Sequence, residues 1–290
     1  MSTMPAHVMT DRGGVGVRPG VLVASGSRSS VFAWGRDAVV KVPFSSTPEA
    51  WIPFEARYTA AVHDAGAPAP RFLGIETVNG RAASVYERVH GRSMWEHMRE
   101  RPEQIPAYTQ LLAELQAHLF SLVPPVSLPA LHDRLTCKIR RAAEQVDPAL
   151  VAALELVPAS ARTRLCHGDL HPGNIIMAGE GPVIIDWFDA ARGDPLADIA
   201  RSSLLMWARA HGQDGPSHLP GAAPDLLDLV RSSYLVAITE LVAPNPDDLL
   251  RWVAVDTVAR IAEGIAIDAL LAIWHDTRCP GLSPVLDDGS

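Results

Sequence analysis

Residues 165–186 read LCHGDLHPGNIIMAGEGPVIID, and they are the most informative segment of the sequence. Two short apolar runs, Ile175–Met177 and Val183–Ile185, flank a turn that contains Gly179 and Gly181. Apolar runs of this length, bounded by turn residues, are typical of buried strands. The segment therefore predicts a β-hairpin with polar side chains at both of its ends.

Three polar residues surround this hairpin in the order that a phosphoryl-transfer site requires. Asn174 precedes the first strand, Asp186 follows the second, and Asp169 lies in the loop that leads to them. The segment HGDLHPGN matches the spacing H-x-D-L-x-x-x-N, in which the Asp accepts the proton of the substrate hydroxyl and the Asn binds magnesium. Asp186 occupies the place of the metal-binding Asp of the kinase D-F-G motif. We therefore expect Asp169 to be catalytic and Asn174 and Asp186 to be metal ligands.

The form of these motifs resembles one branch of the kinase-like enzymes. HGDLHPGN followed by IIDW, residues 184–187, resembles the aminoglycoside phosphotransferase and choline kinase-like family more than a protein kinase. The resemblance implies an α+β, bilobal, protein-kinase-like fold. Its N-terminal lobe, residues 1–90, has an antiparallel sheet of about five strands plus one helix, and its C-terminal lobe, residues 91–290, is mainly helical and holds the catalytic loop.

The sequence before residue 90 supports such a sheet. Short apolar and β-branched runs separated by turn residues cover residues 21–24, 31–34, 38–42, 71–77 and 81–88. The last two runs flank the dipeptide Asn79-Gly80, which favours a tight hairpin turn. Five antiparallel strands follow from this spacing.

Lys41 lies inside the third of these runs, where its charge is costly to bury without a counter-charge. The corresponding Lys of kinases pairs with a Glu on the next helix and with the phosphates of ATP. Glu55, on a helix expected to begin at Pro53, is the partner that we expect. Glu49 is the alternative, because a helix that begins at Pro48 would also carry a carboxylate in its first turn.

Two segments are expected to contact the nucleotide. The turn SGSRSS, residues 25–30, offers small residues and backbone N–H groups to phosphates, and we assign Ser27, Arg28 and Ser29 to this role. A plain hairpin turn would have the same composition. Glu87 and Val89 lie where the resemblance places the passage between lobes, so their main chain would face the adenine.

The segment that follows Asp186 is expected to support the catalytic loop. The sequence GDPLAD, residues 193–198, has a form that recurs in the family that the chain resembles. Asp194 is expected to cap the helix that begins at Pro195, and Asp198 to accept N–H groups of the catalytic loop. Other helices are expected over residues 94–99, 106–122, 224–242 and 246–274, and within 128–154.

Carboxylates on the last two helices are candidates for acceptor binding. Asp256, Arg260 and Glu263 fall on one helical stripe, which is either a solvated face with an Asp256–Arg260 pair or one wall of a groove for a cationic acceptor. From residue 221 onward acidic residues outnumber basic ones by eleven to four, which favours amines. Further substrate candidates are Glu240, Asp268 and Asp189. Asp189 also has the alternative roles of a second metal ligand or a turn residue.

Composition limits the class of protein and its partners. The formal net charge of −8 argues against nucleic acid as a partner, because such binding depends on Lys and Arg. The three cysteines have neither metal-ligand nor C-x-x-C spacing, which fits a reducing cytoplasm. The N-terminus lacks the apolar stretch of a secretory signal, and no apolar run is long enough for a membrane span. We expect a cytoplasmic enzyme without a membrane partner.

The joint occurrence of the kinase parts predicts transfer of a phosphoryl group from ATP or GTP, with Mg²⁺, to an alcohol. By resemblance the acceptor is an antibiotic such as an aminoglycoside, or another cationic, hydroxylated natural product. The alternative enzyme is a metabolite kinase for choline, ethanolamine, homoserine or a sugar. An alternative of another class is a catalytically silent, kinase-like binding module, against which the intact Asp169, Asn174 and Asp186 argue.

Overall fold

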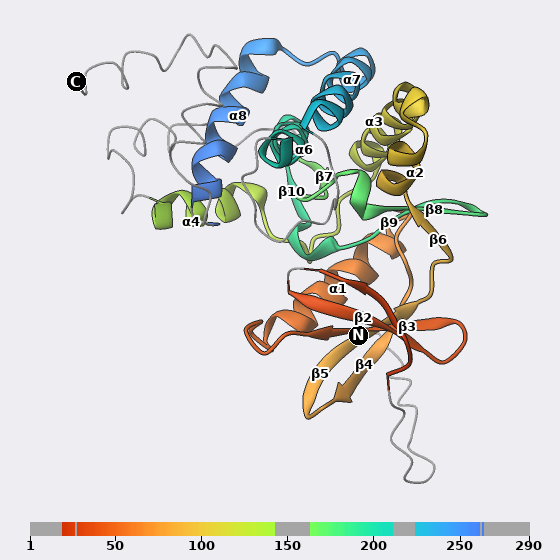
Figure 1. Cartoon of the computed structure of the whole chain (residues 1–290). Helices are drawn as coiled ribbons and strands as arrows, with labels where there is room; N and C mark the ends of the chain where they lie inside the picture. The colour runs from red at the N-terminus through yellow and green to blue at the C-terminus, as the bar shows by residue number, and fades with distance from the viewer. Residues whose placement is uncertain (1–18, 27, 143–162, 211–223, 262, 264–290) are drawn as a thin grey trace.

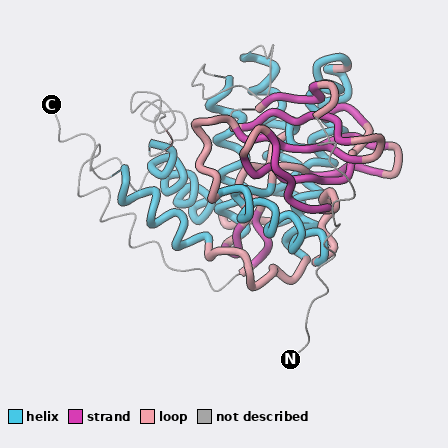
Figure 2. Tube along the Cα trace, turned by 90° about the horizontal axis from the view of Figure 1, so that it is seen from below, coloured by secondary structure: helices cyan, strands magenta, loops and turns pink. Residues whose placement is uncertain are grey.

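The structure is a computed structural model that describes residues 19–26, 28–142, 163–210, 224–261 and 263 (Figure 1). A sheet lies at one end of the molecule and most of the helices lie at the other (Figure 1). Figure 2 views the molecule from the sheet end, where the strands run side by side. This mixed architecture, with an antiparallel N-terminal sheet and a helical C-terminal part, confirms the predicted fold class. The division of the chain into two lobes at residue 90 stays a prediction.

The N-terminal sheet has the five antiparallel strands that the sequence predicts, in the order β1-β2-β3-β5-β4. They are β1 (Leu22–Ser25), β2 (Ser29–Trp34), β3 (Ala38–Pro43), β4 (Phe72–Val78) and β5 (Arg81–Glu87). Asn79 and Gly80 both have positive φ, 51° and 77°, in the turn between β4 and β5. A two-residue hairpin turn with positive φ at both positions matches the twist of its strands, which explains why this dipeptide predicted the hairpin.

Helix α1 (Trp51–Asp64) packs against β4 and β5. It begins two residues before Pro53, so the predicted start was wrong. Pro53 is in the first turn, where a missing backbone N–H costs nothing because those N–H groups have no partner within the helix. Glu55 consequently lies in the second turn, on the buried face of the helix.

The C-terminal part contains three short strands that form a second sheet, in the order β6-β8-β9. The predicted hairpin is present as β8 (Ile175–Ala178) and β9 (Gly181–Ile184), with Ile175 opposite Ile184. β6 (Gly91–Ser93) pairs with β8, and β7 (Arg164–Cys166) pairs with β10 (Ala191–Gly193). Neither of these pairings was predicted, because three-residue strands are too short for an alternating pattern.

Helices make up the rest of this part. They are α2 (Met94–Glu100), α3 (Ile105–Ser121), α4 (Leu131–Ala142), α6 (Pro195–Ala210), α7 (Pro224–Val242) and α8 (Pro246–Ile261), with 3₁₀ turns at Pro102–Gln104, Pro172–Asn174 and Trp187–Asp189. Ser93 caps α2 in a reciprocal capping box with Glu96. Most of the predicted extension of the last helix to residue 274 lies outside the described residues.

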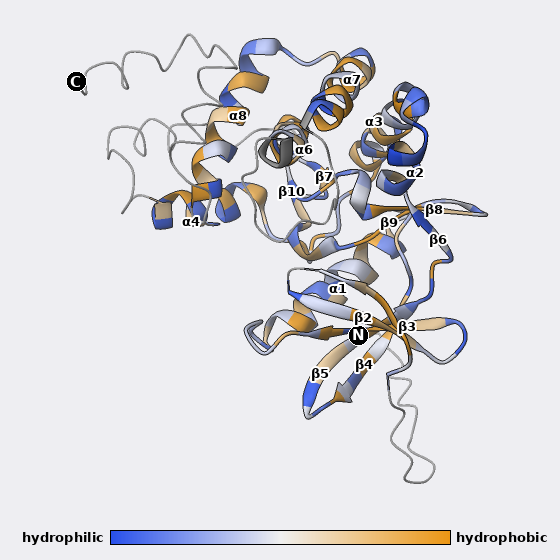
Figure 3. Cartoon of the chain, viewed as in Figure 1, coloured by the Kyte–Doolittle hydropathy of each residue, from blue (hydrophilic) through white to orange (hydrophobic). Residues whose placement is uncertain are grey.

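The buried apolar residues form two separate clusters. The small one joins β3 to β4 and β5 through Val40, Val78, Ala83 and Val85. The large one fills the helical part, where α6 packs against α7 and α8, and α3 against α7. The helices show apolar and polar positions on different faces, as amphipathic helices around a core do (Figure 3). Among the described residues, none of the helices combines the length and apolar composition that a membrane span requires.

Candidate active site

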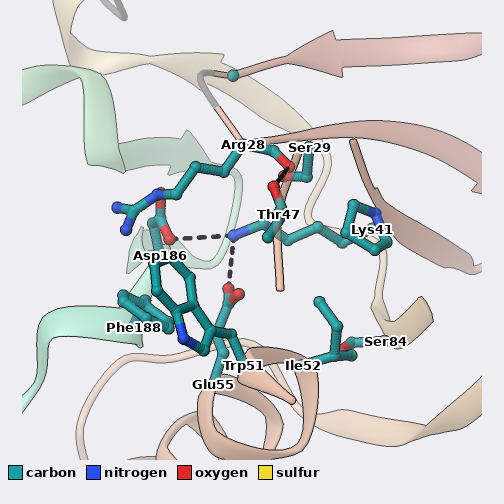
Figure 4. A pocket seen from close by; sticks show the side chains of 12 residues that line it. Arg28, Ser29, Lys41, Thr47, Trp51, Ile52, Glu55, Ser84, Asp186 and Phe188 are labelled. Atoms are coloured by element: carbon teal, nitrogen blue, oxygen red, sulfur yellow. Dashed lines mark hydrogen bonds and ion pairs between the residues drawn. The ribbon is translucent and has the colours of Figure 1, made fainter. Parts of the chain in front are cut away.

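Lys41 connects three parts of the chain. Its Nζ atom lies 2.5 Å from Glu55 Oε1 on α1 and 3.0 Å from Asp186 Oδ1, which follows β9 (Figure 4). Burial alone would lower the pKa of Lys41, but the carboxylates of Asp186 and Glu55 raise it above its ordinary value. The alternative partner, Glu49, instead accepts a hydrogen bond from the backbone N–H of Ala82. The sheet, α1 and the end of β9 therefore meet at one ion-pair cluster.

The catalytic loop is fixed first by His167, which is fully buried. Its Nδ1 atom accepts the backbone N–H of Asp169, so its Nε2 atom carries the proton that is donated to the carbonyl oxygen of Ile185. Burial lowers the pKa of His167, which favours this neutral form. The ring also packs on Trp187, with 4.5 Å between ring centroids. His167 holds the backbone of the loop rather than the substrate.

A buried hydrogen-bond chain holds the same loop from the helical side. Gly168 N donates to Asp198 Oδ1 at 2.7 Å, as the sequence predicted for Asp198. The other carboxylate oxygen of Asp198 accepts from Gln116 Nε2, and Gln116 Oε1 accepts from Tyr234. Asp194 caps the start of α6 through the N–H of Leu196, also as predicted. Sequence reasoning missed Gln116 and Tyr234, because nothing local distinguishes them from other residues of α3 and α7.

Asp169 and Asn174 lie together at the end of the loop. Asn174 Nδ2 donates to the backbone oxygen of Asp169 at 2.9 Å and to its Oδ2 at 3.2 Å. Burial raises the pKa of Asp169 to about 7, while Arg201 opposes the shift and Asp189 adds to it. A carboxylate with a pKa near neutrality suits a general base.

Asp186 has left-handed backbone angles, φ 64° and ψ 63°, which are uncommon for a residue with a side chain. Such strain occurs often at functional positions. The carboxamide oxygen of Asn174 is left as an acceptor, because its nitrogen binds Asp169. Among the described residues no three His, Cys, Asp or Glu side chains cluster as a complete metal site. Mg²⁺ requires only hard oxygen ligands, one or two from the protein and the rest from phosphates and water, so Asn174 and Asp186 fit that ion.

The turn before β2 is fixed by hydrogen bonds from the segment after β3 to its backbone. The carbonyl oxygen of Arg28 accepts hydrogen bonds from Phe44 N and Thr47 Oγ1. The Arg28 guanidinium extends over the Phe188 ring, 4.7 Å from its centroid, and Ser29 is buried. Ser27 lies outside the described residues.

The passage from β5 to β6 contains the other expected nucleotide contacts. Glu87 uses its carboxylate to accept the backbone N–H of Arg71, and its own N–H donates to the carbonyl of Arg71. The N–H of Val89 makes no backbone hydrogen bond within the described part of the chain. Val89 therefore has a main-chain donor to offer, whereas the N–H of Glu87 is already used.

Three of the five carboxylates expected to bind a cationic acceptor are paired with cations of the protein. Asp256 is buried and lies 3.7 Å from Arg201, and Glu263 lies 3.0 Å from Arg201 and 2.6 Å from Lys138. Asp189 lies 2.8 Å from Arg134. The cation that pairs with Asp256 is Arg201 of α6, and no ion pair between Asp256 and the predicted partner Arg260 is found in the described part of the chain. The stripe is therefore neither the solvated face of the first alternative nor a free anionic wall.

The remaining two candidates do not join this cluster. Glu240 is exposed on α7 and makes no ion pair with the cluster among the described residues, and Asp268 lies outside them. Sequence reasoning missed the cations Arg134, Lys138 and Arg201. Arg134 and Lys138 are four residues apart on the strongly amphipathic α4, which was the available signal.

Two cavities lie on either side of this arrangement. One is lined by residues that include Arg28, Ser29, Lys41, Glu55, Asp186 and Phe188. The other lies behind the catalytic loop, and its lining includes Arg134, Lys138, Gly168, Asp189, Arg201 and Asp256. The segment after β9 takes part in both, since Asp186 and Phe188 line the first cavity and Asp189 lines the second.

Comparison with known proteins identifies similar sequences and folds. A model of the phosphotransferase enzyme family matches residues 21–220. The chain is 23% identical to an aminoglycoside-3'-phosphotransferase of type VIII, covering 83% of this chain and 92% of that one, with a TM-score of 0.57. For the aminoglycoside phosphotransferase APH(3'')-Id from Streptomyces rimosus the identity is 20%, with 81% and 91% covered and a TM-score of 0.56.

A third solved structure is a thermostable mutant of aminoglycoside phosphotransferase APH(4)-Ia in a ternary complex with ADP and hygromycin B. It is 17% identical, with 90% of this chain and 92% of that chain covered and a TM-score of 0.59. None of the curated proteins matches the sequence. At these identities the solved structures show a shared fold, and the family match covers most of the chain.

Proposed function

The chain belongs to the phosphotransferase enzyme family, and from this we propose that it transfers the terminal phosphoryl group of ATP or GTP to a hydroxyl of a small molecule. The observation that carries the proposal is the double ion pair of Lys41 with Glu55 and Asp186, next to a loop that holds Asp169 and Asn174. Kinases need all of these parts together, because their catalysis is mainly positioning and charge stabilisation. The alternative, a catalytically silent, kinase-like binding module, would not need Asp169, Asn174 and Asp186 to be kept together with this lysine.

In the proposed reaction Asp169 accepts the proton of the acceptor hydroxyl as the hydroxyl oxygen attacks the terminal phosphorus. The new bond is between oxygen and phosphorus, and the bond that breaks is between that phosphorus and the bridging oxygen, so the nucleoside diphosphate leaves. Lys41 orients the phosphates, and Glu55 and Asp186 hold Lys41 charged. Mg²⁺ held by Asn174 and Asp186 would neutralise the charge of the phosphate oxygens.

For the acceptor we propose a hydroxylated natural product such as an aminoglycoside, within the cytoplasm. The proposal draws on solved relatives that contain hygromycin B or, in another case, ATP and streptomycin. The pairing of Asp256 and Glu263 with Arg201 and Lys138 removes the charge argument for a polycation, because these carboxylates are already neutralised. These two carboxylates therefore give no preference for a cationic acceptor over a neutral one.

The test is a screen for consumption of ATP and GTP, with Mg²⁺, against aminoglycosides, peptide antibiotics, macrolides, amino alcohols and sugars. We expect at least one acceptor to stimulate release of nucleoside diphosphate by the natural protein and not by the Asp169→Ala variant. If no acceptor stimulates release from either nucleotide, the silent binding module becomes the better account. Stimulation that persists in Asp169→Ala would remove Asp169 from the role of base.

A further inference from the structure

Arg28 connects two cavities that lie on the segment after β9. It lines the cavity that contains Lys41, whereas its ion-pair partner Asp189 lines the cavity behind the loop. The Nη2 atom of Arg28 lies 3.8 Å from Asp189 Oδ2. The guanidinium crosses from the sheet to the helical part above Phe188 (Figure 4). Among the described residues of this turn, Arg28 is the only one that makes an ion pair with the helical part.

The two oxygens of Asp189 differ in how firmly they are held. Oδ1 lies 2.8 Å from Arg134 and 3.8 Å from Lys138, and the same Arg134 also donates to the carbonyls of Phe188 and Ala190. In the described residues Oδ2 has an ion pair with Arg28 alone. The Arg28 side chain is 42% exposed, and an exposed pair at this distance contributes little stability. This contact is therefore the one that a ligand can displace.

Asp186 lies between Lys41 and Arg28 (Figure 4). Phosphates bound at Asp186 would therefore have Lys41 on the side of the sheet and Arg28 on the side of Asp189, which lines the second cavity. The terminal phosphoryl group is the end of the phosphate chain that faces the acceptor. The planar guanidinium of Arg binds phosphate oxygens in a bidentate manner, which a long, screened contact with a carboxylate cannot match.

We propose that, on nucleotide binding, the Arg28 guanidinium leaves Asp189 and binds the terminal phosphoryl group that is transferred. The inference rests on the proposed function and assigns to this side chain a contact with the reacting group. It also frees Asp189 Oδ2 in the cavity behind the catalytic loop. Nucleotide binding thus leaves a hydrogen-bond acceptor, Asp189 Oδ2, in the second cavity.

The experiment compares, by titration calorimetry with Mg²⁺, the affinity for a non-hydrolysable nucleoside triphosphate analogue with that for the diphosphate. It uses the natural protein and the variants Arg28→Ala, Asp189→Asn and the double variant, with adenosine and guanosine forms. Arg36→Ala is the matched control, since Arg36 is exposed in the β2–β3 turn and lies outside both cavities. Because nucleotide affinity is measured without an acceptor, the experiment does not require that the acceptor be known.

We expect Arg28→Ala to weaken binding of the triphosphate analogue by about tenfold, as loss of a charge-assisted hydrogen bond does, and to leave diphosphate binding nearly unchanged. Asp189→Asn should tighten triphosphate binding by about two- to fivefold, because it removes a weak competing ion pair. That gain should vanish in the double variant, and Arg36→Ala should match the natural protein.

Equal weakening of diphosphate and triphosphate binding in Arg28→Ala would overturn the assignment to the terminal phosphoryl group. A gain from Asp189→Asn that persists without Arg28 would overturn the exchange between the two partners. Failure of the natural protein to bind either nucleotide would instead contradict the proposed function. The two ideas therefore fail in different measurements.

Discussion

Asp169 is the residue on which the proposed chemistry depends most. Its pKa is raised to about 7, first by burial and then by the nearby charges of Asp189 and Asp186, against the lowering effect of Arg201. The sequence predicts its position through the spacing to Asn174, but it cannot predict this pKa. The charges that set it come from α6 and from the segment after β9, and they meet Asp169 only in the folded chain.

The raised pKa leads to a prediction for the pH dependence of the reaction. A general base acts in its deprotonated form, so kcat/KM should fall as the pH is lowered through about 7, tenfold per pH unit well below that value. The rate with an active acceptor from the screen, measured between pH 5 and 9, checks this. A rate that stays constant down to pH 5 would show that Asp169 titrates at its ordinary value or is not the base.

At the scale of elements, the catalytic loop depends on a close approach of two backbone segments. Gly168 has φ +77°, and a Cβ atom there would lie 2.4 Å from the carbonyl oxygen of Asp189. A contact of that length forces the loop away from the segment after β9. Because the same loop carries Asp169, its displacement misplaces the base.

Gly168→Ala should therefore lower the free energy of unfolding by about 2 kcal/mol or more, and reduce kcat much more than nucleotide affinity. Gly35→Ala is the control, since Gly35 has a similar φ of +70° but no atom within 4 Å of an added Cβ. That control should lose about 1 kcal/mol, from backbone strain alone, and keep its activity. Similar losses in both variants would show that the contact with Asp189 is unimportant. Chemical denaturation and the screening assay measure both quantities.

The hydrogen-bond chain from α7 through α3 to α6 is a second feature at this scale. Gln116→Leu leaves the buried Tyr234 hydroxyl and one oxygen of Asp198 without their present partner, which should cost about 1–3 kcal/mol of stability. Gln110→Leu on the same helix is the control, because within the described residues the Gln110 side chain makes a single, exposed hydrogen bond, with Glu114. Its stability should change little. Equal unfolding midpoints for the two variants in urea would contradict the importance of the chain.

The elements themselves were largely predictable, and the reason differs from one to the next. The β4–β5 hairpin is encoded in Asn79-Gly80, and the start of α2 in the Ser93–Glu96 capping box, both of which are local in sequence. The strands β6, β7 and β10 exist only because partners elsewhere in the chain pair with them. Local patterns carry no information about such pairing.

For the whole molecule, the arrangement of charge is the feature that the sequence described least well. An excess of acidic residues after residue 221 suggested an anionic surface, yet Asp256 and Glu263 are neutralised by Arg201 and Lys138 from α6 and α4. Composition counts charges, but long-range contacts decide which of them face a ligand. The chemistry of transfer was therefore predictable from one segment, whereas the acceptor surface was not.

The sheet and the helical part have separate apolar cores, and Lys41 of the sheet pairs with Asp186 of the helical part. Asp169 and Asn174 come from the helical part, so phosphoryl transfer requires that the two parts keep this relative position.

The most direct measurement is detection by mass spectrometry of the phosphorylated acceptor, made in parallel with a measurement of Mg²⁺-nucleotide binding, for the natural protein and the Asp169→Asn variant. The account predicts a phosphorylated hydroxyl with the natural protein, and none with Asp169→Asn despite unchanged nucleotide affinity. Equal product from both proteins, or none from the natural protein while it binds nucleotide, would contradict it.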